Sequence, residues 1–381
     1  MSACTAAESP ASLGVAAGST AVIDFAPGDE LELIRDTARA FAADQLRPHE
    51  RASEAARGVP GALRRAFADI GLGALELPER LGGAGLGALA RVLVLEELAA
   101  GDAGAAVALD PWGCALYPLA RLGGEQALRE LALPLLERPG ARAVLVWNGG
   151  GHLLSEAGRA RGRVPWVPSD RVDLLVALDG EGAFAVDEGI VREPLRGAGL
   201  RAAGASELRL DGAPIRAAWR DPAGAREALA RARLYTAALL LGVMRASAEF
   251  SREYALQRVA FGRPIAHHQA LAFLIADMAA AVDGARLLVW DAAWRLDRGD
   301  DAAEACASAF SEAAEQAMFV TPNALQILGG HGFMQDYPVE KHMREARTLG
   351  LLLGGADAAR DEAGRALVAL DGPVPLGVET G

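Results

Sequence analysis

Two segments of the chain combine polar side chains that bind anionic groups with glycines that let a ligand come close. Residues 257–265 are QRVAFGRPI, and residues 326–347 are QILGGHGFMQDYPVEKHMREAR. The guanidinium of Arg258 can bind the two negative charges of a pyrophosphate bidentately, while the backbone near Gly262 approaches the same group. These residue types suit contacts with an anionic group of a ligand.

The composition of the chain argues against two large classes of protein. A formal net charge of −12 over 381 residues disfavours a general affinity for nucleic acid, because a polyphosphate partner attracts clustered positive charge. The longest apolar run near a predicted helix centre, residues 234–244, is well below the roughly 20 residues that a membrane span requires. We therefore predict a soluble protein with neither a nucleic-acid partner nor a membrane span.

The cysteines indicate a reduced compartment. Cys4, Cys114 and Cys306 are far apart and show neither C-x-x-C spacing nor a clustered histidine partner. This pattern fits a cytoplasmic protein and predicts no metal site.

The hydrophobic pattern divides the chain into three zones between two tails. Residues 29–138 show the apolar spacing of amphipathic helices and predict an N-terminal helical domain. Residues 139–220 contain short apolar runs separated by turn residues and predict a middle β domain. Residues 221–370 are helical again and predict a C-terminal bundle. Residues 1–28 and 371–381 are predicted tails.

Turn residues locate two features inside the β zone. Residues 174–178 and 183–186 lie on either side of the sequence DGEG, which predicts a hairpin. Residues 206–210 predict a strand, and the following Asp211 and Gly212 predict a turn after it.

Two long helices are predicted after the β zone. The first covers residues 234–258, and the second covers residues 267–298, with Gly299 in a plausible C-cap position. At 1.5 Å per residue the second helix would be roughly 45 to 50 Å long. Paired helices of this length favour a four-helix bundle.

The order of helical zone, β zone and long-helix bundle is that of the acyl-CoA dehydrogenase fold, which the chain resembles over about residues 29–365. Residues 77–85, LPERLGGAG, followed by VLEEL at 94–98, are similar to the VPEEYGGAG…EEL signature of that family. Residues 257–265 with Gln269 match its QR-x-x-FG-x-P-I…Q pattern. The resemblance implies a mainly α protein with a helical N-terminal domain, a β-barrel-like middle domain and a C-terminal four-helix bundle.

The resemblance implies that the cofactor is FAD. Arg258 would then bind its pyrophosphate, with Phe261 against the cofactor and Gln269 as a polar contact. Other contacts reach the FAD of a neighbouring subunit, so the family likeness implies an oligomer, formed with identical or related subunits. The residues that would make those contacts are Gln326, Gly329 and Gly330.

The β zone retains part of a second flavin-binding segment. Residues 162–169, GRVPWVPS, resemble the GEKTWITNG segment of the family, in which the tryptophan covers the flavin ring. Trp166 is retained, Ser169 is a further predicted cofactor contact, and Pro168 stands where a threonine hydroxyl would reach the flavin. The preceding TEP-x-AGSD loop is shortened, with residues 147–151, WNGGG, where it should begin.

The chemistry of the family requires a base. A carboxylate must remove a proton from the carbon next to a thioester while hydride leaves the next carbon for flavin N5. The glutamate that usually does so is replaced by Leu353, and the second position known in the family is occupied by Ala232. Arg233, beside that second position, keeps the arginine of the family and is the predicted substrate-binding residue.

Three hypotheses explain the two empty positions. In the first, the base has moved, with Asp357 as the main candidate because it lies within one helical turn of Leu353, and with Asp336 and Glu340 as further candidates. In the second, the chain is a non-catalytic half of a heteromeric dehydrogenase. In the third, the fold performs other flavin chemistry of the monooxygenase type.

The predicted function is therefore the α,β-dehydrogenation of an acyl thioester by a flavoprotein whose base is relocated or supplied by a partner subunit. The alternative is a non-catalytic thioester-binding or partner subunit. The resemblance implies an acyl-CoA or acyl-carrier thioester as ligand and allows an electron-accepting flavoprotein as a further partner.

Overall fold

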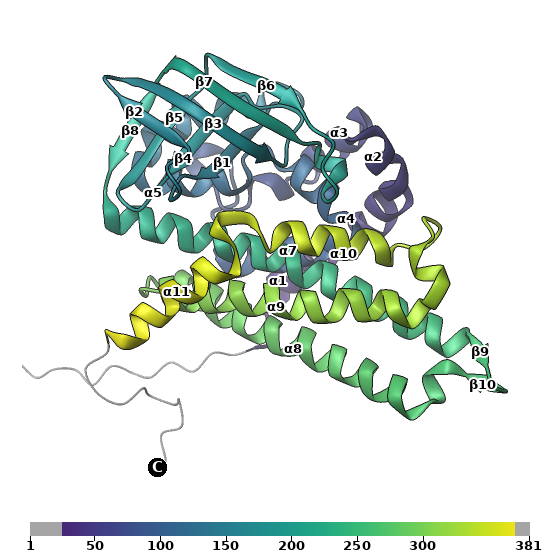
Figure 1. Cartoon of the computed structure of the whole chain (residues 1–381). Coiled ribbons are helices and arrows are strands. Elements are labelled where there is room, and N and C mark those ends of the chain that lie inside the picture. The colour runs from purple at the N-terminus through teal and green to yellow at the C-terminus, as the bar shows by residue number, and fades with distance from the viewer. Residues whose placement is uncertain (1–24, 370–381) are drawn as a thin grey trace, which may run out of the picture.

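The computed structural model describes residues 25–369. The predicted tail over 371–381 and most of the predicted tail over 1–28 lie outside these residues. Figure 1 shows strands β1 to β8 gathered on one side of a layer of long helices, with β9 and β10 at the far end of that layer. No helix within the described residues combines the length and the apolar character needed to cross a lipid bilayer.

The N-terminal helical part packs around α4. Phe41 at the end of α1 meets Phe67 of α3 with ring centroids 5.7 Å apart. The loop before α4 needs a glycine, because a Cβ at Gly83 would lie 2.1 Å from the carbonyl oxygen of Leu77. The helices are α1 Asp29–Phe41, α2 Glu50–Ala56, α3 Gly61–Asp69, α4 Ala88–Leu109, α5 Leu116–Ala127 and α6 Leu133–Leu136.

The β part consists of two four-stranded sheets, with strand orders β1-β4-β5-β8 and β2-β3-β7-β6. Their facing side chains form a separate apolar core that includes Val144, Leu175 and Leu208. The strands are β1 Ala143–Trp147, β2 Leu153–Glu156, β3 Arg159–Val167, β4 Leu174–Leu178, β5 Gly182–Val186, β6 Ile190–Pro194, β7 Ser206–Pro214 and β8 Ala217–Arg220.

The predicted hairpin is confirmed, and the predicted turn after residue 210 is wrong. Strands β4 and β5 pair antiparallel, and the Asp179 carboxylate accepts hydrogen bonds from the backbone N–H groups of Glu181 and Gly182 at 2.8 and 3.0 Å. Strand β7 instead continues through Gly212, whose φ of +74° accompanies a register shift against β3. A glycine with positive φ formed a bulge there rather than a turn.

The C-terminal part contains three long helices and two shorter ones. Helix α7 begins where the Asp221 carboxylate accepts a hydrogen bond from Gly224 N–H at 3.0 Å, and α8 ends before Gly299, which has a φ of +78°. The elements are α7 Pro222–Gln257, β9 Val259–Ala260, β10 Arg263–Pro264, α8 Gln269–Asp297, α9 Ala303–Leu328, α10 Val339–Leu349 and α11 Gly355–Val368.

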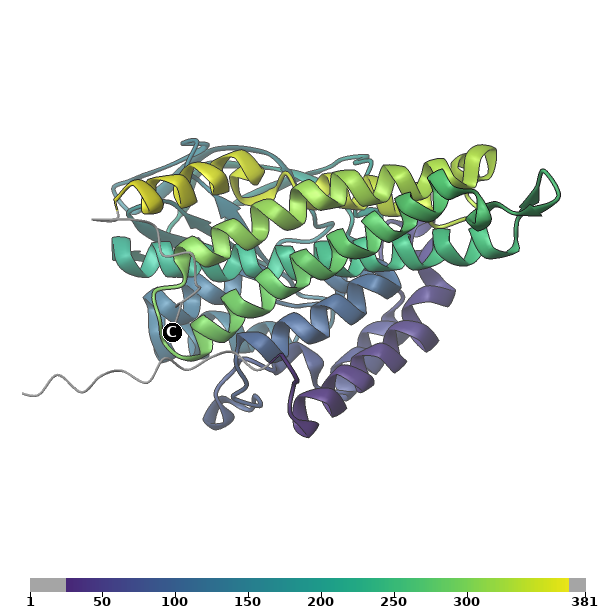
Figure 2. The same cartoon turned by 90° about the horizontal axis from the view of Figure 1, so that it is seen from below.

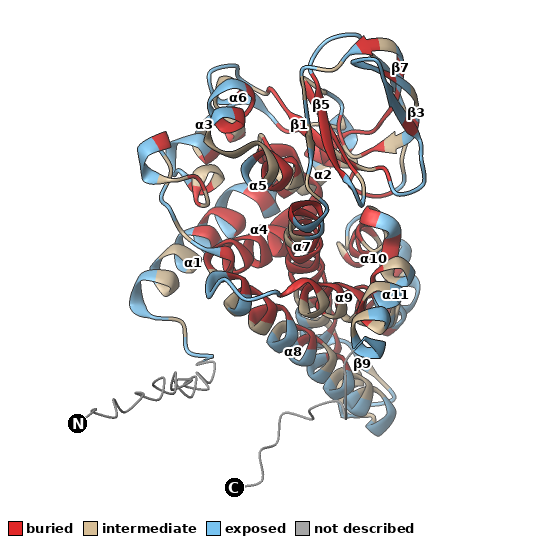
Figure 3. Ribbon diagram, turned by 90° about the vertical axis from the view of Figure 1, so that its left-hand side faces the viewer, coloured by how far each residue is buried: buried red, intermediate tan, exposed pale blue. Residues whose placement is uncertain are grey.

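The two helical parts share one apolar core. Helix α4 lies directly against α7, because a Cβ at Gly242 would lie only 2.3 Å from the carbonyl oxygen of Glu96. Figure 3 shows both helices as the buried centre of the molecule, and Figure 2 shows α7, α8 and α9 running side by side. This close packing holds α7 rigidly beneath the β part.

A buried charge cluster joins α4 to α10. The Lys341 ammonium donates to Asp102 at 2.9 Å and to Glu345 at 2.8 Å, and all three side chains are almost fully buried. Burial raises the pKa of Glu345 to about 7. The cluster therefore depends on Lys341 as the cation that faces two buried carboxyl groups.

We predict that Lys341→Met lowers the free energy of unfolding by roughly 3–5 kcal/mol, because it leaves two buried carboxylates without a cation. The loss should be smaller at pH 5 than at pH 8, since the carboxylates can be neutralised by protonation as the pH falls. Urea unfolding at both pH values measures this difference.

A matched control for this prediction is Arg365→Met. Arg365 pairs with Asp361 on the exposed side of α11, and such pairs contribute less than about 0.5 kcal/mol. Equal losses in the two variants would show that burial of the Lys341 cluster does not matter.

Candidate functional site

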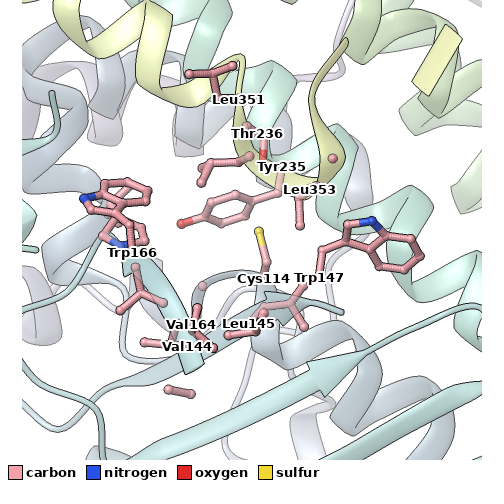
Figure 4. A pocket seen from close by; sticks show the side chains of 18 of the residues that line it. Cys114, Val144, Leu145, Trp147, Val164, Trp166, Tyr235, Thr236, Leu351 and Leu353 are labelled. Carbon is pink, nitrogen blue, oxygen red and sulfur yellow. The ribbon is translucent and has the colours of Figure 1, made fainter. Parts of the chain in front are cut away.

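A cavity of about 510 Å³ lies where strands β1 and β3 face α7 (Figure 4). In that view Trp166 and Trp147 lie on opposite sides, with Cys114 and Leu353 between them. The lining comes from five separate parts of the chain. Its main residues are Val107, Trp112, Cys114, Arg142, Leu145, Trp147, His152, Val164, Trp166, Pro168, Tyr235, Thr236, Leu239, Leu351 and Leu353.

The structure brings together two of the residues singled out in the sequence. Trp166 and Leu353, which are 187 positions apart in the chain, both line the cavity. Leu353 has a φ of +56°, so its backbone adopts a left-handed conformation that is unusual for leucine. Ser169 does not line the cavity, because it is buried and its hydroxyl donates to the carbonyl oxygen of Arg171 at 2.5 Å.

No aspartate or glutamate within the described residues lines this cavity. Burial raises the pKa of Cys114, and the nearby Asp110 raises it further, so the thiol stays protonated at neutral pH. Burial also raises the pKa of Tyr235, whose hydroxyl donates to Asp110 at 3.0 Å. His152 lies at the exposed edge, between β1 and β2.

Ala232, at the second position where the family can carry its base, lies just outside the cavity. Ala232 is fully buried on α7, and its carbonyl oxygen accepts hydrogen bonds from the Thr236 hydroxyl at 2.9 Å and from Cys114 Sγ at 3.6 Å. Arg233, the predicted substrate contact, is not part of the lining. Its side chain is buried and pairs with Glu362, which ties α7 to α11.

The carboxylates that could have replaced the base lie elsewhere. Asp357 is fully exposed at the start of α11, where it faces Arg360 at 3.8 Å and lines a different hollow. Asp336 is exposed after the glycine-rich segment. Glu340 pairs with Arg51 at 2.6 Å and with Arg344 at 2.8 Å. The structure brings none of them to Trp166 and Leu353.

The predicted pyrophosphate contacts gather at the other end of α7. Arg258 follows the last turn of α7, and the β9–β10 hairpin that contains Phe261 projects from the bundle (Figures 1 and 2). Tyr254 near this end hydrogen-bonds His331 at 2.8 Å, which places the Gly329–Phe333 segment beside it. The exposed residues of this group are Arg258, Phe261, Gln269, Gln326, Gly329 and Gly330.

The two groups of residues are too far apart to act on one ligand group within a single chain. Thr236 lines the cavity, and Arg258 lies 22 residues further along α7. At 1.5 Å per residue this separation is roughly 33 Å along the helix axis. The cavity and the hairpin end therefore serve different parts of a ligand or different subunits.

Several lining residues were not predicted from the sequence. Arg142 directly precedes the apolar run of β1, and a charged residue at the start of a buried strand is a signal that could have found it. Tyr235 and Thr236 are polar residues within the apolar run of α7, which is a weaker signal of the same kind. Cys114 and Trp112 follow α4 in a short connection and carry no pattern that points to a cavity.

Comparison with known proteins identifies the family on both sides of the β part. The family model for the acyl-CoA dehydrogenase N-terminal domain matches residues 28–137, and that for the acyl-CoA dehydrogenase C-terminal domain matches residues 223–368. Benzylmalonyl-CoA dehydrogenase of Aromatoleum aromaticum is 31% identical over 365 residues, which cover 87% of this chain and 96% of that protein.

Solved structures agree with this assignment. Butyryl-CoA dehydrogenase from Megasphaera elsdenii, at 24% identity, superposes with a TM-score of 0.81 over 91% of this chain and 100% of its own, and so shows the shared fold. The Tcur3481-Tcur3483 steroid ACAD, at 27% identity, superposes with a TM-score of 0.79 over 90% of this chain and 98% of its own. The chain thus belongs to the acyl-CoA dehydrogenase family, whose members are FAD-dependent oxidoreductases that act on CH–CH groups.

Proposed function

We propose that this chain is a subunit of an acyl-thioester dehydrogenase that has lost its own base and works with a partner subunit that carries one. The observation behind this proposal is the lining of the cavity at Trp166. Leu353 occupies the position of the family glutamate there, and no carboxylate within the described residues lines the cavity. A leucine side chain cannot accept a proton, and the protonated Cys114 and Tyr235 do not replace it.

The hairpin end of α7 fits a pyrophosphate-bearing cofactor shared between subunits. Phe261 is 95% exposed, and a Cβ at Gly262 or Gly329 would meet no atom within 4 Å. Arg258 is exposed nearby and can offer a bidentate guanidinium to a diphosphate. When bound, FAD supplies the hydride acceptor of the dehydrogenation.

The predicted ligand contacts fall into two groups. Those in the chain's own cavity are partly lost, and those that would reach a neighbouring subunit are retained. In the lining of the chain's own cavity, Pro168 offers no hydroxyl and Leu353 offers no base. Outside this lining, the hydroxyl of Ser169 is bonded within its own turn. The contacts that would reach a neighbour, such as Arg258 and Gly329, are all present and exposed. This division supports a partner in a hetero-oligomer over a self-sufficient enzyme.

The relatives support the class of ligand and partner. Benzylmalonyl-CoA dehydrogenase is named for a CoA thioester, and the name of the Tcur3481-Tcur3483 steroid ACAD joins two components. A structural neighbour at 25% identity is described with an electron-transferring flavoprotein. We infer an acyl-CoA or acyl-carrier thioester as ligand, a related chain as partner and such a flavoprotein as electron acceptor, in the cytoplasm.

A second candidate function is the binding of an acyl thioester without oxidation. The retained cavity without a base favours it. The two candidates differ in whether the assembled protein reduces its flavin when a thioester is added.

The first prediction from this proposal concerns the cofactor. Arg258→Ala should weaken FAD binding by roughly ten- to a hundredfold, because it removes a charge-assisted contact to the pyrophosphate. Fluorescence titration of the chain with FAD, alone and with candidate partner subunits, measures this change. Arg263→Ala, in the same exposed hairpin, is the control and should leave binding within about threefold. Absence of retained flavin in every preparation would contradict the prediction.

The second prediction concerns assembly. Helix α8 exposes Phe273, Leu287 and Leu288, which are 59%, 46% and 44% exposed, and such side chains require a partner surface. We expect a dimer or a tetramer, formed with identical or related chains, by light scattering at micromolar concentration. Leu288→Glu should shift the protein to smaller species, whereas Leu154→Glu on exposed β2 should not. A stable, flavin-loaded monomer would be incompatible with this expectation.

The third prediction concerns the missing base. The isolated chain should reduce its flavin slowly or not at all with straight-chain acyl-CoAs, as followed anaerobically by the visible spectrum. Leu353→Glu, or Ala232→Glu, should raise the rate by about 10²–10⁴ if the rest of the site is intact, because positioned proton transfer contributes that much.

Leu353→Gln is the control, because glutamine has the shape of glutamate but cannot act as a base. This variant should stay inactive. Fast flavin reduction by the unmodified chain, abolished by Asp357→Asn, would show a relocated base. That outcome would rule out the proposed base-free subunit.

A further inference from the structure

No group of the described residues forms a hydrogen bond or an ion pair with the buried guanidinium of Arg142. Arg142 is 3% exposed, it lines the cavity, and its Nε and Nη1 atoms are buried without any hydrogen bond among the described residues. A guanidinium offers five N–H donors and remains charged at neutral pH. Leaving such donors unpaired away from water is costly, so a ligand that pairs with them would be strongly favoured.

Two carboxylates near Arg142, those of Asp110 and Asp173, are engaged by other groups. Asp110 accepts from the Tyr235 hydroxyl at 3.0 Å and from the Gly113 backbone N–H at 2.8 Å, and it also pairs with Arg91. Asp173 accepts from the backbone N–H of Arg142, not from its guanidinium. No carboxylate of the described residues forms an ion pair with the Arg142 side chain.

A second guanidinium, that of Arg64, acts on Arg142. Burial lowers the pKa of Arg142, and the neighbouring charge of Arg64 lowers it further. Arg64 itself donates to the carbonyl oxygen of Ala108 at 2.7 Å. Asp110 and Asp170 act on the pKa of Arg142 in the opposite direction, but neither forms an ion pair with its guanidinium, and of the two arginines only Arg142 lines the cavity.

Arg142 lies at one end of β1, and Trp147 lies at the other. Ala143 and Trp147 are four residues apart, which corresponds to roughly 13 Å along a strand. Trp147 is next to the base position, because a Cβ at Gly354 would lie 3.3 Å from its Nε1. An acyl group that begins beside Leu353 and extends along β1 would thus bring its far end towards Arg142.

We infer that the cavity takes an acyl thioester whose acyl group carries a second, free carboxylate, and that Arg142 binds this carboxylate. The inference rests on the proposed function only in treating the cavity as the acyl-thioester site. The geometry that carries it is an unpaired, buried guanidinium at the end of the cavity away from Leu353. A carboxylate matches the guanidinium with two parallel N–H···O bonds.

The test compares adipyl-CoA with hexanoyl-CoA, which have acyl chains of equal carbon number and differ in the terminal carboxylate. Binding to the full-length chain is measured by isothermal titration, without reference to flavin reduction. The unmodified chain should bind adipyl-CoA roughly ten- to a hundredfold more tightly than hexanoyl-CoA. Arg142→Met should abolish this preference and leave hexanoyl-CoA binding within about threefold, whereas Arg142→Lys should retain part of it.

Thermal unfolding supplies a second readout. Arg142→Met removes an unpaired buried charge, so the ligand-free variant should melt no lower than the unmodified chain. Adipyl-CoA should raise the melting temperature of the unmodified chain and of Arg138→Met, an exposed control, more than hexanoyl-CoA does, whereas the two thioesters should raise that of Arg142→Met equally. Free adipate should bind at least tenfold more weakly than adipyl-CoA; equal affinity would overturn the thioester assignment.

The outcomes separate this inference from the proposed function. Equal binding of the two thioesters by the unmodified chain would overturn the inference and leave the cavity as an acyl-thioester site. The same holds if Arg142→Met weakens both thioesters equally, because Arg142 would then contact a part that they share. Failure of both thioesters to bind would overturn the inference and also the acyl-thioester site on which it rests.

Discussion

The fixed rise of an α-helix sets the distance between the cavity and the residues around Arg258, because the single helix α7 connects the two. Tyr235 and Thr236 on α7 line the cavity, and Arg258 follows the last turn of the same helix. The contact at Gly242 holds α7 against α4, so the helix cannot bend to bring its two ends together. The two ends can therefore contact one cofactor group only if they come from two different chains, which is the arrangement proposed above.

Much of the fold could be predicted from the sequence because its signals are local. The hairpin at Asp179 and the end of α8 at Gly299 each depend on a few adjacent residues, and both agree with the structure. The turn predicted at Gly212 is wrong because turns and bulges both place glycine at positive φ. Only the neighbouring strand, which is distant in the sequence, decides between them.

The candidate site could be predicted only in part, for a related reason. The contacts around Arg258 lie in a short contiguous motif, so their residue types and spacing are visible in the sequence. The cavity combines α4, β1, β3, α7 and the segment at Leu353. Its chemistry depends on the absence of a carboxylate from the lining that the described residues form. That Arg142 is unpaired follows from the engagement of Asp110 and Asp173 with other groups, which only the three-dimensional arrangement reveals.

Leu353 also determines the polarity of the cavity. A carboxylate in its place would keep water nearby and would offset positive charge, whereas leucine between Trp147 and Trp166 does neither. The effective dielectric constant in such a compartment is low, so the field of a buried charge is weakly screened over short distances. The exchange of one acidic side chain for an apolar one thus leaves Arg142 without an opposing carboxylate in the lining formed by the described residues, and a bound group that carries or develops negative charge near it would be favoured.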